Sequence, residues 1–307
     1  MRLLSFGPPG RERAGLLAGE DIIDLRAASH NLFAEPLPAD LRDILALPDW
    51  FEKLRHVFAS VSFLSREVFY AQNATRIGAP IPNPSKIIAL GANYKEHLEE
   101  TKMDIETPKT PILFSKAPSS VNGPYDDILY PPETKALDYE VELAIVIGRQ
   151  GKRIKPGEAY EYISGYTILN DISARDIQMG GQKGLGDQWF RGKSLDTFAP
   201  MGPWIVTKDE LPELHNLRIS LKLNGEIRQD SNTGKLIFKI PEIVAFVSSG
   251  ITLFPGDIIS TGTPSGVGMF SNPPRLLQPS DVIKSEIEGI GFLENKIVSE
   301  QSSGGGG

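Results

Sequence analysis

The feature that most limits the possible folds of this chain is a series of short strand-like runs after residue 80. These runs are rich in β-branched and aromatic residues and are bounded by turn signals. They occupy residues 86–90, 112–116, 139–148, 162–170, 204–207, 217–223, 257–261, 281–287 and 292–297. One helix is convincing, over 241–250, with Pro241 in its first turn and Gly250 at its end. Many strands with turns such as Asn224-Gly225 predict a β-rich sandwich or roll, not a doubly wound α/β sheet.

A small N-terminal unit is predicted over residues 1–78. Two strands, 1–7 and 14–25, precede helical patterns around 40–47 and 50–60. The segment 78–85 contains three prolines, which predict an extended and stiff linker. We therefore place a domain boundary near residue 80, between a small α+β domain (1–78) and a larger domain (79–300). Residues 301–307 are predicted to form a flexible tail.

Charge and composition narrow the classes of partner. The net charge of -7 and the scattered basic residues argue against a nucleic-acid partner, because phosphate backbones repel a negative surface. No apolar run approaches the roughly 20 residues that span a bilayer, which argues against a membrane protein. A small molecule is the partner that remains. The N-terminus MRLLSFG lacks the apolar stretch of a secretory signal, so a cytoplasmic location is predicted.

The run 137–148 carries two acids at alternate positions. Successive side chains of a strand face opposite ways, so Glu140 and Glu142 share a face with Ala144 and Val146. The opposite face consists of Tyr139, Val141, Leu143, Ile145 and Ile147. Two partly buried carboxylates about 7 Å apart need a shared cation or a raised pKa, and a bound metal meets both needs. The alternative is an edge strand with two ordinary surface glutamates.

A third acid, Asp171, follows the strand-like run 162–170. An acid at this place projects from the strand end, although Asp171 can equally cap the following turn. The chain contains no cysteine, which excludes disulfides, thiolate nucleophiles and cysteine zinc sites. Oxygen ligands from Glu140, Glu142 and Asp171 would suit Mg²⁺ or Mn²⁺.

His97 is the histidine in the most suggestive context, because Glu100 follows it three residues later. On a helix these two side chains lie on one face, so the carboxylate can hold one imidazole nitrogen and leave the other as a general base. The alternative is a solvated surface histidine. Lys193, set among aromatic and small residues, can bind a carboxylate or stabilise an enolate, or it can be a surface lysine. The glycine-rich stretch 256–268 can meet an anion or form an ordinary tight turn.

Taken in order, several separated motifs between residues 80 and 298 resemble the fumarylacetoacetate hydrolase family. These motifs are NYKEHLEE, FSKAPSSVNGP, DYEVELAIVIG, NDISARDIQ, RGKSLDTFAPMGPW and PGDIISTGTPSGVG. The chain is most similar to the shorter bacterial and mitochondrial members, which include acylpyruvate hydrolases, oxaloacetate decarboxylases and tautomerases, and diketo sugar acid hydrolases. The resemblance implies a β-sandwich roll with a small N-terminal α+β domain, and a homodimer. It also makes the mitochondrial matrix an alternative location.

The resemblance also assigns roles to individual residues. It implies that Glu140, Glu142 and Asp171 hold the metal. It further implies that His97 and Glu100 form a catalytic dyad on a mobile lid. The other implied site residues are Lys193, as the active-site lysine, and Arg175, Gln178 and Thr263 near the substrate. True fumarylacetoacetases carry a further aspartate seven residues before the histidine; here that position is Leu90, which argues against fumarylacetoacetate itself as the substrate.

The motifs and the residue chemistry together predict an enzyme that acts on a small 2-oxo acid. The metal would chelate the substrate and, as a Lewis acid, stabilise the enolate formed when a bond at C3 breaks. Hydrolytic cleavage, with His97 activating a water, and decarboxylation are the predicted reactions of this β-keto or diketo acid. The alternatives are a keto–enol tautomerase or isomerase of an acid such as oxaloacetate, and, in a different class, a non-catalytic binding or regulatory protein.

Overall fold

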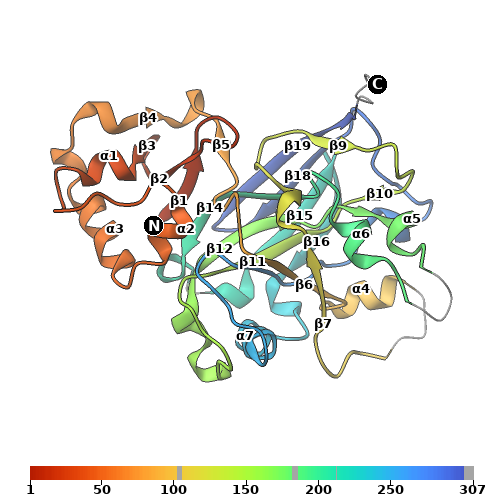
Figure 1. The fold of residues 1–307 in the computed structure, drawn as a ribbon. Helices are drawn as coiled ribbons and strands as arrows, with labels where there is room; N and C mark the ends of the chain where they lie inside the picture. Colours follow the sequence, from red (N-terminus) through yellow and green to blue (C-terminus); the bar gives the residue numbers. More distant parts are fainter. Residues whose placement is uncertain (102–105, 182–185, 212, 301–307) are drawn as a thin grey trace, which may run out of the picture.

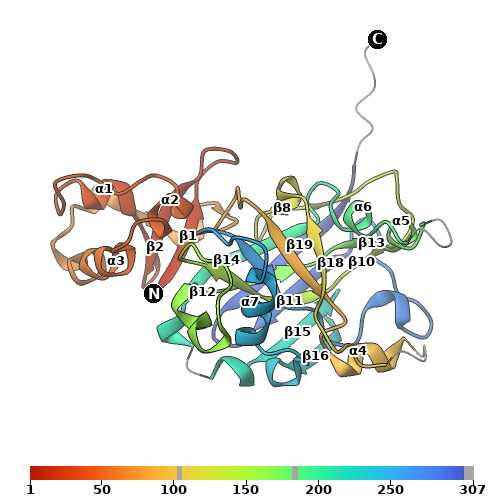
Figure 2. The ribbon, with the colours of Figure 1, turned by 60° about the horizontal axis from the view of Figure 1, so that its bottom comes forward.

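The computed structural model describes residues 1–101, 106–181, 186–211 and 213–300, and its strands form one large and two smaller sheets within these residues (Figure 1). The predicted flexible tail, 301–307, lies outside the described residues. The N-terminal elements gather at one end of the molecule, and α4, α5 and α6 lie at the opposite end in both ribbon views (Figures 1 and 2).

Twelve of the described strands belong to the large mixed sheet, in the order β4-β3-β2-β1-β14-β12-β11-β17-β6-β7, with β5 beside β1 and β8 beside β14. Their bounds are β1 Arg2–Phe6, β2 Arg13–Ala18, β3 Asp21–Asp24, β4 Phe69–Ala71, β5 Ile77–Gly78, β6 Ile87–Gly91, β7 Ile112–Lys116, β8 Val121–Asn122, β11 Val141–Ile147, β12 Ile163–Asn170, β14 Ala199–Thr207 and β17 Ile258–Ser260. The strands predicted after residue 80 that fall in this sheet are all present.

A five-stranded sheet, ordered β16-β15-β18-β19-β9, and the pair β10-β13 complete the described strands. Their bounds are β9 Ile128–Tyr130, β10 Leu137–Asp138, β13 Ser173–Ala174, β15 Arg218–Leu223, β16 Glu226–Asn232, β18 Val282–Ile287 and β19 Gly291–Ser299. The predicted turn at Asn224-Gly225 joins β15 to β16, and both of its residues have positive φ, as a two-residue hairpin with this sequence requires. Strand β16 was not predicted, because its polar sequence carries no apolar alternation.

Strand β11 shows how the layers are stacked. The odd-numbered residues from Val141 to Ile147 belong to one hydrophobic core, which they share with β15, β18 and β19 of the smaller sheet. Ala144 and Val146, on the opposite face, belong to a second core shared with the N-terminal helices. The predicted alternation of this strand is therefore confirmed, and the two sheets pack face to face as a sandwich.

The described helices are few and short. Their bounds are α1 Leu25–Ser29, α2 Leu41–Leu45, α3 Trp50–Ala59, α4 Lys95–Glu100, α5 Arg175–Gln178, α6 Trp189–Lys193 and α7 Ile240–Ser248. The predicted helix at 241–250 corresponds to α7, whose first turn contains Pro241 and is capped where Glu242 accepts a hydrogen bond from the Lys239 amide at 2.7 Å. Helices α1, α5 and α6, each of four or five residues, were not predicted.

One strand predicted in the N-terminal unit is divided in the structure. The run 14–25 is not one strand but a hairpin of β2 and β3, which turns at Gly19 with φ of 64°. The unit is joined to the rest of the molecule by backbone pairing, because β1 runs antiparallel to β14. The proline-containing segment after Gly78 is packed against β1, where the Ser5 hydroxyl donates to the Pro80 carbonyl. The boundary near residue 80 stays a prediction.

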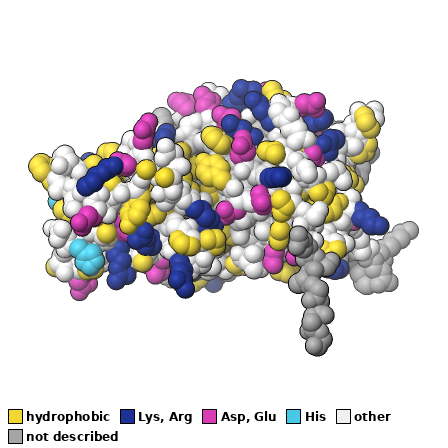
Figure 3. All heavy atoms as spheres, turned by 90° about the horizontal axis from the view of Figure 1, so that it is seen from above, with side chains coloured by type: hydrophobic (Ala, Val, Ile, Leu, Met, Phe, Trp, Pro, Cys, Tyr) yellow, Lys and Arg dark blue, Asp and Glu magenta, His cyan; other side chains and the backbone are white. Residues whose placement is uncertain are grey.

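The surface gives two simple observations. Over the face drawn in Figure 3, basic side chains lie among acidic ones and do not form a continuous basic surface there. None of the helices in the described part of the chain has the length and apolar character needed to cross a membrane.

Candidate active site and metal centre

Three buried carboxylates meet where strands β11 and β12 come together. Glu140 precedes β11, Glu142 lies within it and Asp171 follows β12. The antiparallel register pairs Val141 with Asn170, so the start of one strand lies beside the end of the other. One oxygen from each acid lies within 4.8 Å of the other two. The structure thus brings the three predicted ligands together.

Glu140 is held between two cations. Its Oε1 accepts a hydrogen bond from Arg175 Nη2 at 2.5 Å, and its Oε2 accepts one from Lys193 Nζ at 2.6 Å. Burial acts to raise the pKa of Glu140, but the charges of Arg175 and Lys193 outweigh burial and hold the pKa well below its usual range. Glu140 is therefore an anion whose charge is already compensated.

Two lysines hold Asp171. Its two oxygens accept hydrogen bonds from Lys116 Nζ at 2.6 Å and Lys193 Nζ at 2.7 Å. Burial acts to lower the pKa of Lys193, but the charges of Asp171 and Glu140 outweigh it and raise the pKa, so Lys193 stays protonated. Lys116 is fully buried and also donates to the carbonyls of Ile172 and Lys193. Its three donors thus all go to the protein, and burial lowers its pKa despite Asp171.

Glu142 has a different environment, because its bonded donors are neutral. Its Oε2 accepts hydrogen bonds from the Ser260 hydroxyl at 2.6 Å and the Gly262 amide at 2.8 Å. Burial, followed by the negative charges of Asp171 and Glu140, raises its pKa well above the usual range. Within the described residues no lysine or arginine donates to this carboxylate.

The cluster as a whole fits a divalent cation. Glu140 and Asp171 are matched by buried cations, whereas Glu142 is a buried carboxylate with no cationic partner among the described residues. A buried anion of this kind is costly unless a positive charge accompanies it. Oxygen donors are the ligands that Mg²⁺ and Mn²⁺ prefer. The donor set therefore fits the predicted metal.

The predicted dyad is present as a hydrogen-bonded pair on helix α4. His97 Nδ1 lies 2.6 Å from Glu100 Oε1, and Glu100 Oε2 accepts a hydrogen bond from the Gly266 amide at 2.7 Å. The carboxylate thus takes Nδ1, which makes Nε2 the nitrogen available as a base. The charge of His97 contributes to the lowered pKa of Glu140, so the imidazole and the carboxylate cluster are close enough to interact.

The residues predicted to contact the substrate form hydrogen bonds with other residues of the protein. The buried Arg175 donates from Nε to Asp138 at 2.9 Å, from Nη1 to Gln178 at 3.1 Å and from Nη2 to Glu140. The Thr263 hydroxyl donates to the Val141 carbonyl at 3.0 Å. Arg175 thus lies in the cluster as a neighbour of a candidate metal ligand, and its contact with a substrate stays a prediction.

Comparison with known proteins identifies the family. The family described as fumarylacetoacetate (FAA) hydrolase C-terminal matches residues 86–298. The chain belongs to the fumarylacetoacetate hydrolase family. It is 50% identical over 220 residues to the rat protein named oxaloacetate tautomerase Fahd2a, mitochondrial, with 72% of this chain and 68% of that protein covered. It is 41% identical over 302 residues to the Xenopus laevis oxaloacetate tautomerase fahd2, mitochondrial, with 97% and 90% covered.

Solved structures of this family share the fold. A fumarylacetoacetate hydrolase from Exiguobacterium antarcticum matches with a TM-score of 0.79 at 35% identity, over 98% of this chain and all of that one. A maleylpyruvate hydrolase from Sphingobium, in complex with manganese(II) and pyruvate, matches with a TM-score of 0.77 at 30% identity and the same coverage. The predicted β-sandwich fold and the prediction that this chain is an enzyme of the family are confirmed.

Sequence reasoning missed three buried residues of the candidate site. Asp138 precedes Glu140 by two positions, so the alternation that identified the acids extends to it. Lys116 ends β7, whose other residues are partly or fully exposed, and the motif that carries the resemblance was the available signal. Gln229, which donates to Thr263 Oγ1 at 2.8 Å, lies on the unpredicted strand β16 and gave no signal.

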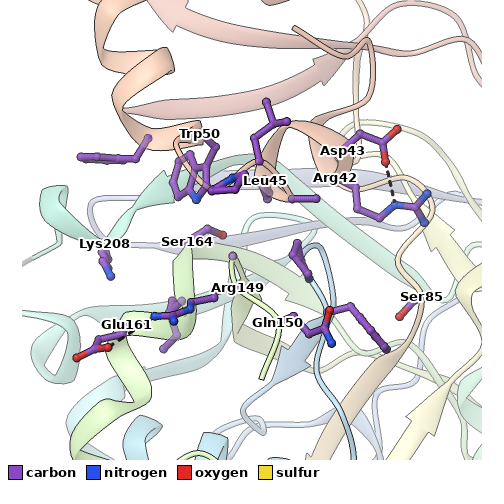
Figure 4. Close-up of a pocket in the computed structure, with 18 of the residues that line it drawn as sticks. Arg42, Asp43, Leu45, Trp50, Ser85, Arg149, Gln150, Glu161, Ser164 and Lys208 are labelled. Atoms are coloured by element: carbon purple, nitrogen blue, oxygen red, sulfur yellow. Dashed lines mark ion pairs between the residues drawn. The ribbon is translucent and has the colours of Figure 1, made fainter. Parts of the chain in front are cut away.

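A wide groove lies elsewhere on the molecule. It has a volume of about 1070 Å³, and none of the three clustered acids lines it. Figure 4 shows Trp50 and Leu45 of the N-terminal unit on one side, and Arg149 and Glu161 on the other. Gly148, next to the last residue of β11, also lines it, so the groove lies at the end of this strand away from the acids. The carboxylate cluster is therefore distinct from this cavity.

Proposed function

We propose that this chain is a divalent-metal-dependent keto–enol tautomerase of oxaloacetate or a closely similar 2-oxo acid. The observation that carries the proposal is a cluster of three buried carboxylates with a histidine–glutamate dyad beside it. The names of the rat and frog relatives support tautomerisation as the first choice over the cleavage reactions predicted from the sequence.

In this proposal Glu140, Glu142 and Asp171 hold Mg²⁺ or Mn²⁺. The metal, when bound, supplies a Lewis acid for the carboxylate and keto oxygens of the substrate. The manganese(II) ion in the complex of the Sphingobium maleylpyruvate hydrolase supports this class of metal. The burial of the Glu142 carboxylate, with only neutral donors bonded to it among the described residues, supports a cation at this point.

The protein side chains supply the proton movements. His97, oriented by Glu100, removes a proton from C3 through Nε2, and the C2=C3 double bond forms. The electron pair moves to the oxygen at C2, which becomes the enol hydroxyl when it takes up a proton. Lys193 is protonated and buried, so it can stabilise the negative charge at that oxygen. In the reverse direction His97 returns the proton to C3.

Carbon–carbon cleavage of a β-keto or diketo acid is the second candidate. In a hydrolysis, His97 would deprotonate a water that attacks the distal carbonyl, and the bond at C3 would break. Loss of carbon dioxide from a C3 carboxylate would need no attacking water. The observation that favours this candidate is the structural match to a maleylpyruvate hydrolase with pyruvate bound.

The test measures the three outcomes side by side. Purified protein with Mg²⁺ or Mn²⁺ is mixed with enol-rich oxaloacetate, and the enol absorbance, pyruvate and carbon dioxide are followed together. Tautomerisation predicts a loss of enol absorbance without formation of pyruvate. Decarboxylation predicts formation of both pyruvate and carbon dioxide. Acylpyruvates, including maleylpyruvate, test hydrolysis. If no substrate reacts faster than in the metal-only control, the proposed substrate class is wrong.

A homodimer and a cytoplasmic location stay predictions. The word mitochondrial in the names of the rat and frog relatives favours the alternative compartment. Light scattering after size exclusion would measure the subunit number, and fractionation of the source cells would test the compartment.

A further inference from the structure

Asp138 is a buried carboxylate to which the proposed reaction assigns no role. It is 0% exposed, and each of its oxygens accepts two hydrogen bonds. Oδ1 accepts from the amides of Tyr139 at 2.9 Å and Gly268 at 2.7 Å. Oδ2 accepts from the Met269 amide at 3.0 Å and from Arg175 Nε at 2.9 Å. The acceptor capacity of Asp138 therefore goes to donors of the protein itself.

One side of this arrangement leads to the metal cluster. Arg175 bridges Asp138 and Glu140, with its Nε on the first and its Nη2 on the second. Burial acts to lower the pKa of Arg175, but the charges of Glu140 and Asp138 outweigh it and raise the pKa, so the bridge stays cationic. A planar guanidinium with two fixed partners sets the direction of the Glu140 carboxylate. Asp138 thus acts on Glu140 through Arg175.

The other side leads to the dyad through the turn 266–270. Asp138 binds the amides at Gly268 and Met269 in the middle of this turn. At its start, the Gly266 amide donates to Glu100; at its end, the ring of Phe270 lies 6.1 Å from that of His97. The fit is close, because a Cβ at Gly268 would lie 2.6 Å from Asp138 Oδ1.

We infer that Asp138 is a positioning residue that couples the metal carboxylates to the His97–Glu100 dyad. It orients Glu140 through Arg175 and orients Glu100 through the turn 266–270. Its role is the same whichever reaction the site catalyses, and only the kinetic part of the test rests on the proposed function. Loss of Asp138 should therefore change metal affinity and the behaviour of the base together.

Asp138→Asn is the main variant, because an amide places an NH₂ group against two donors whichever way it turns. Asp257→Asn is the matched control. Asp257 is also 0% exposed and accepts from the Phe254 amide at 2.6 Å, but it adjoins the opposite end of β11, where its carbonyl binds the Ile147 amide. Both variants remove a buried carboxylate, and only the first touches the site.

Three measurements are compared in wild type and both variants. Calorimetric titration with Mn²⁺, without substrate, should show a Kd about 10- to 100-fold weaker in Asp138→Asn, the usual scale for residues that orient ligands. At saturating Mn²⁺, kcat should still fall by roughly 10-fold on the same scale. The third readout is the kcat–pH profile, which should differ from that of wild type, because the Glu100 carboxylate that holds His97 Nδ1 is no longer fixed by the turn. Asp257→Asn should leave all three unchanged, whatever its melting temperature.

The outcomes separate the two sides of the inference. A Mn²⁺ Kd in Asp138→Asn equal to that of Asp257→Asn would overturn the link to the metal cluster. A normal kcat and pH profile at saturating Mn²⁺ would overturn the link to the dyad. If wild type reacts with no 2-oxo acid, the proposed function fails, while the Mn²⁺ titration still decides the link to Glu140.

Two further variants keep the test decisive if Asp138→Asn does not fold. Arg175→Lys keeps the charge but cannot hold Asp138 and Glu140 together, so it should weaken Mn²⁺ binding. Met269→Pro removes one amide that binds Asp138, so it should lower kcat and leave Mn²⁺ affinity unchanged. The reverse pattern, with metal loss in Met269→Pro and not in Arg175→Lys, would contradict the assignment.

Discussion

The two ends of strand β11 differ in the burial of the charged side chains around them. At the end with Glu140 and Glu142, carboxylates and cations are buried together, and their pKa values are displaced in both directions. At the other end, beside the groove of about 1070 Å³, Arg149 and Glu161 are exposed and lie 3.9 Å apart. Desolvated charges cost free energy unless they are compensated, whereas exposed pairs contribute little. The other end also has one buried acid, Asp257, which is paired with Lys86. A cluster of several buried charges, and not cavity size, therefore marks the candidate active site.

The largest effect should come from the base at the acid end. His97→Ala should lower kcat by roughly 10²- to 10⁴-fold, the usual scale for a lost acid–base group, and leave Mn²⁺ affinity unchanged. His56→Ala, in helix α3 of the N-terminal unit, is the matched control and should keep wild-type kcat. If His97→Ala also lost affinity for Mn²⁺, the histidine would be a metal ligand and not only a base.

Lys116 tests whether the buried charges depend on one another. Lys116→Met leaves Asp171 without one of its two ammonium partners and should destabilise the metal-free protein by about 3–5 kcal/mol, as the loss of one member of a buried pair does. Mn²⁺ should restore part of this loss, because it compensates the same carboxylate. The measurement is urea unfolding with and without Mn²⁺.

The control for this variant is Lys86→Met at the opposite end of β11. Lys86 pairs with the buried Asp257 but is itself partly exposed, and Asp257 keeps the amide of Phe254 as a donor. A smaller loss that Mn²⁺ does not restore is expected. If Mn²⁺ restored both variants equally, its stabilising effect would not be specific to the carboxylate cluster.

Glu142 should show opposite effects on metal binding and on stability. Glu142→Gln should weaken Mn²⁺ binding by more than about 100-fold, beyond the range for residues that only orient ligands. The melting temperature of the metal-free protein should rise, because a neutral amide removes repulsion from Asp171 and Glu140. Glu161→Gln at the groove should change neither quantity. A fall in metal-free stability in Glu142→Gln would mean that the negative charge at this position is compensated without metal.

The raised pKa of Glu142 also predicts a pH dependence. An acid whose folded-state pKa is raised contributes stability below its unfolded pKa, and this stability is lost as pH rises through the folded pKa. Metal-free wild type should therefore melt at progressively lower temperature above the usual glutamate range, by roughly a few degrees relative to Glu142→Gln. Glu140 has a lowered pKa, so its contribution to stability is lost as pH falls below the usual glutamate range. If the melting temperatures of metal-free wild type and Glu142→Gln changed with pH by the same amount, the raised pKa of Glu142 would be contradicted.

Local patterns in the sequence predicted much of the site. Alternation places Glu140 and Glu142 on one face, and a spacing of three pairs His97 with Glu100; both patterns depend on neighbours within a few residues. The grouping of Asp171 with the two glutamates was implied only by the family resemblance, because it requires the pairing of β11 with β12. The metal, substrate and catalytic roles of these residues stay predictions, because side-chain geometry alone does not measure them.

Contacts between distant segments could not be predicted in this way. The pairing of β1 with β14 joins residues about two hundred positions apart and leaves no periodic signal. The same holds for Lys116, whose partner Asp171 is 55 residues away. The link from Asp138 to the turn at Gly268 spans 130 residues. Strand pairing and the packing of strand ends and loops create these contacts, so they become visible only in the folded molecule.

The smallest effect is expected at the groove. Arg149→Ala removes an exposed guanidinium that lies over the ring of Tyr162 at 5.2 Å and is 3.9 Å from Glu161. Exposed pairs of this kind contribute at most about 1 kcal/mol, so kcat/KM and Mn²⁺ affinity should stay within about twofold of wild type. A large rise in KM with unchanged Mn²⁺ affinity would place substrate contacts at the groove. The buried charges would then mark the metal site alone, and the substrate would bind at the other end of β11.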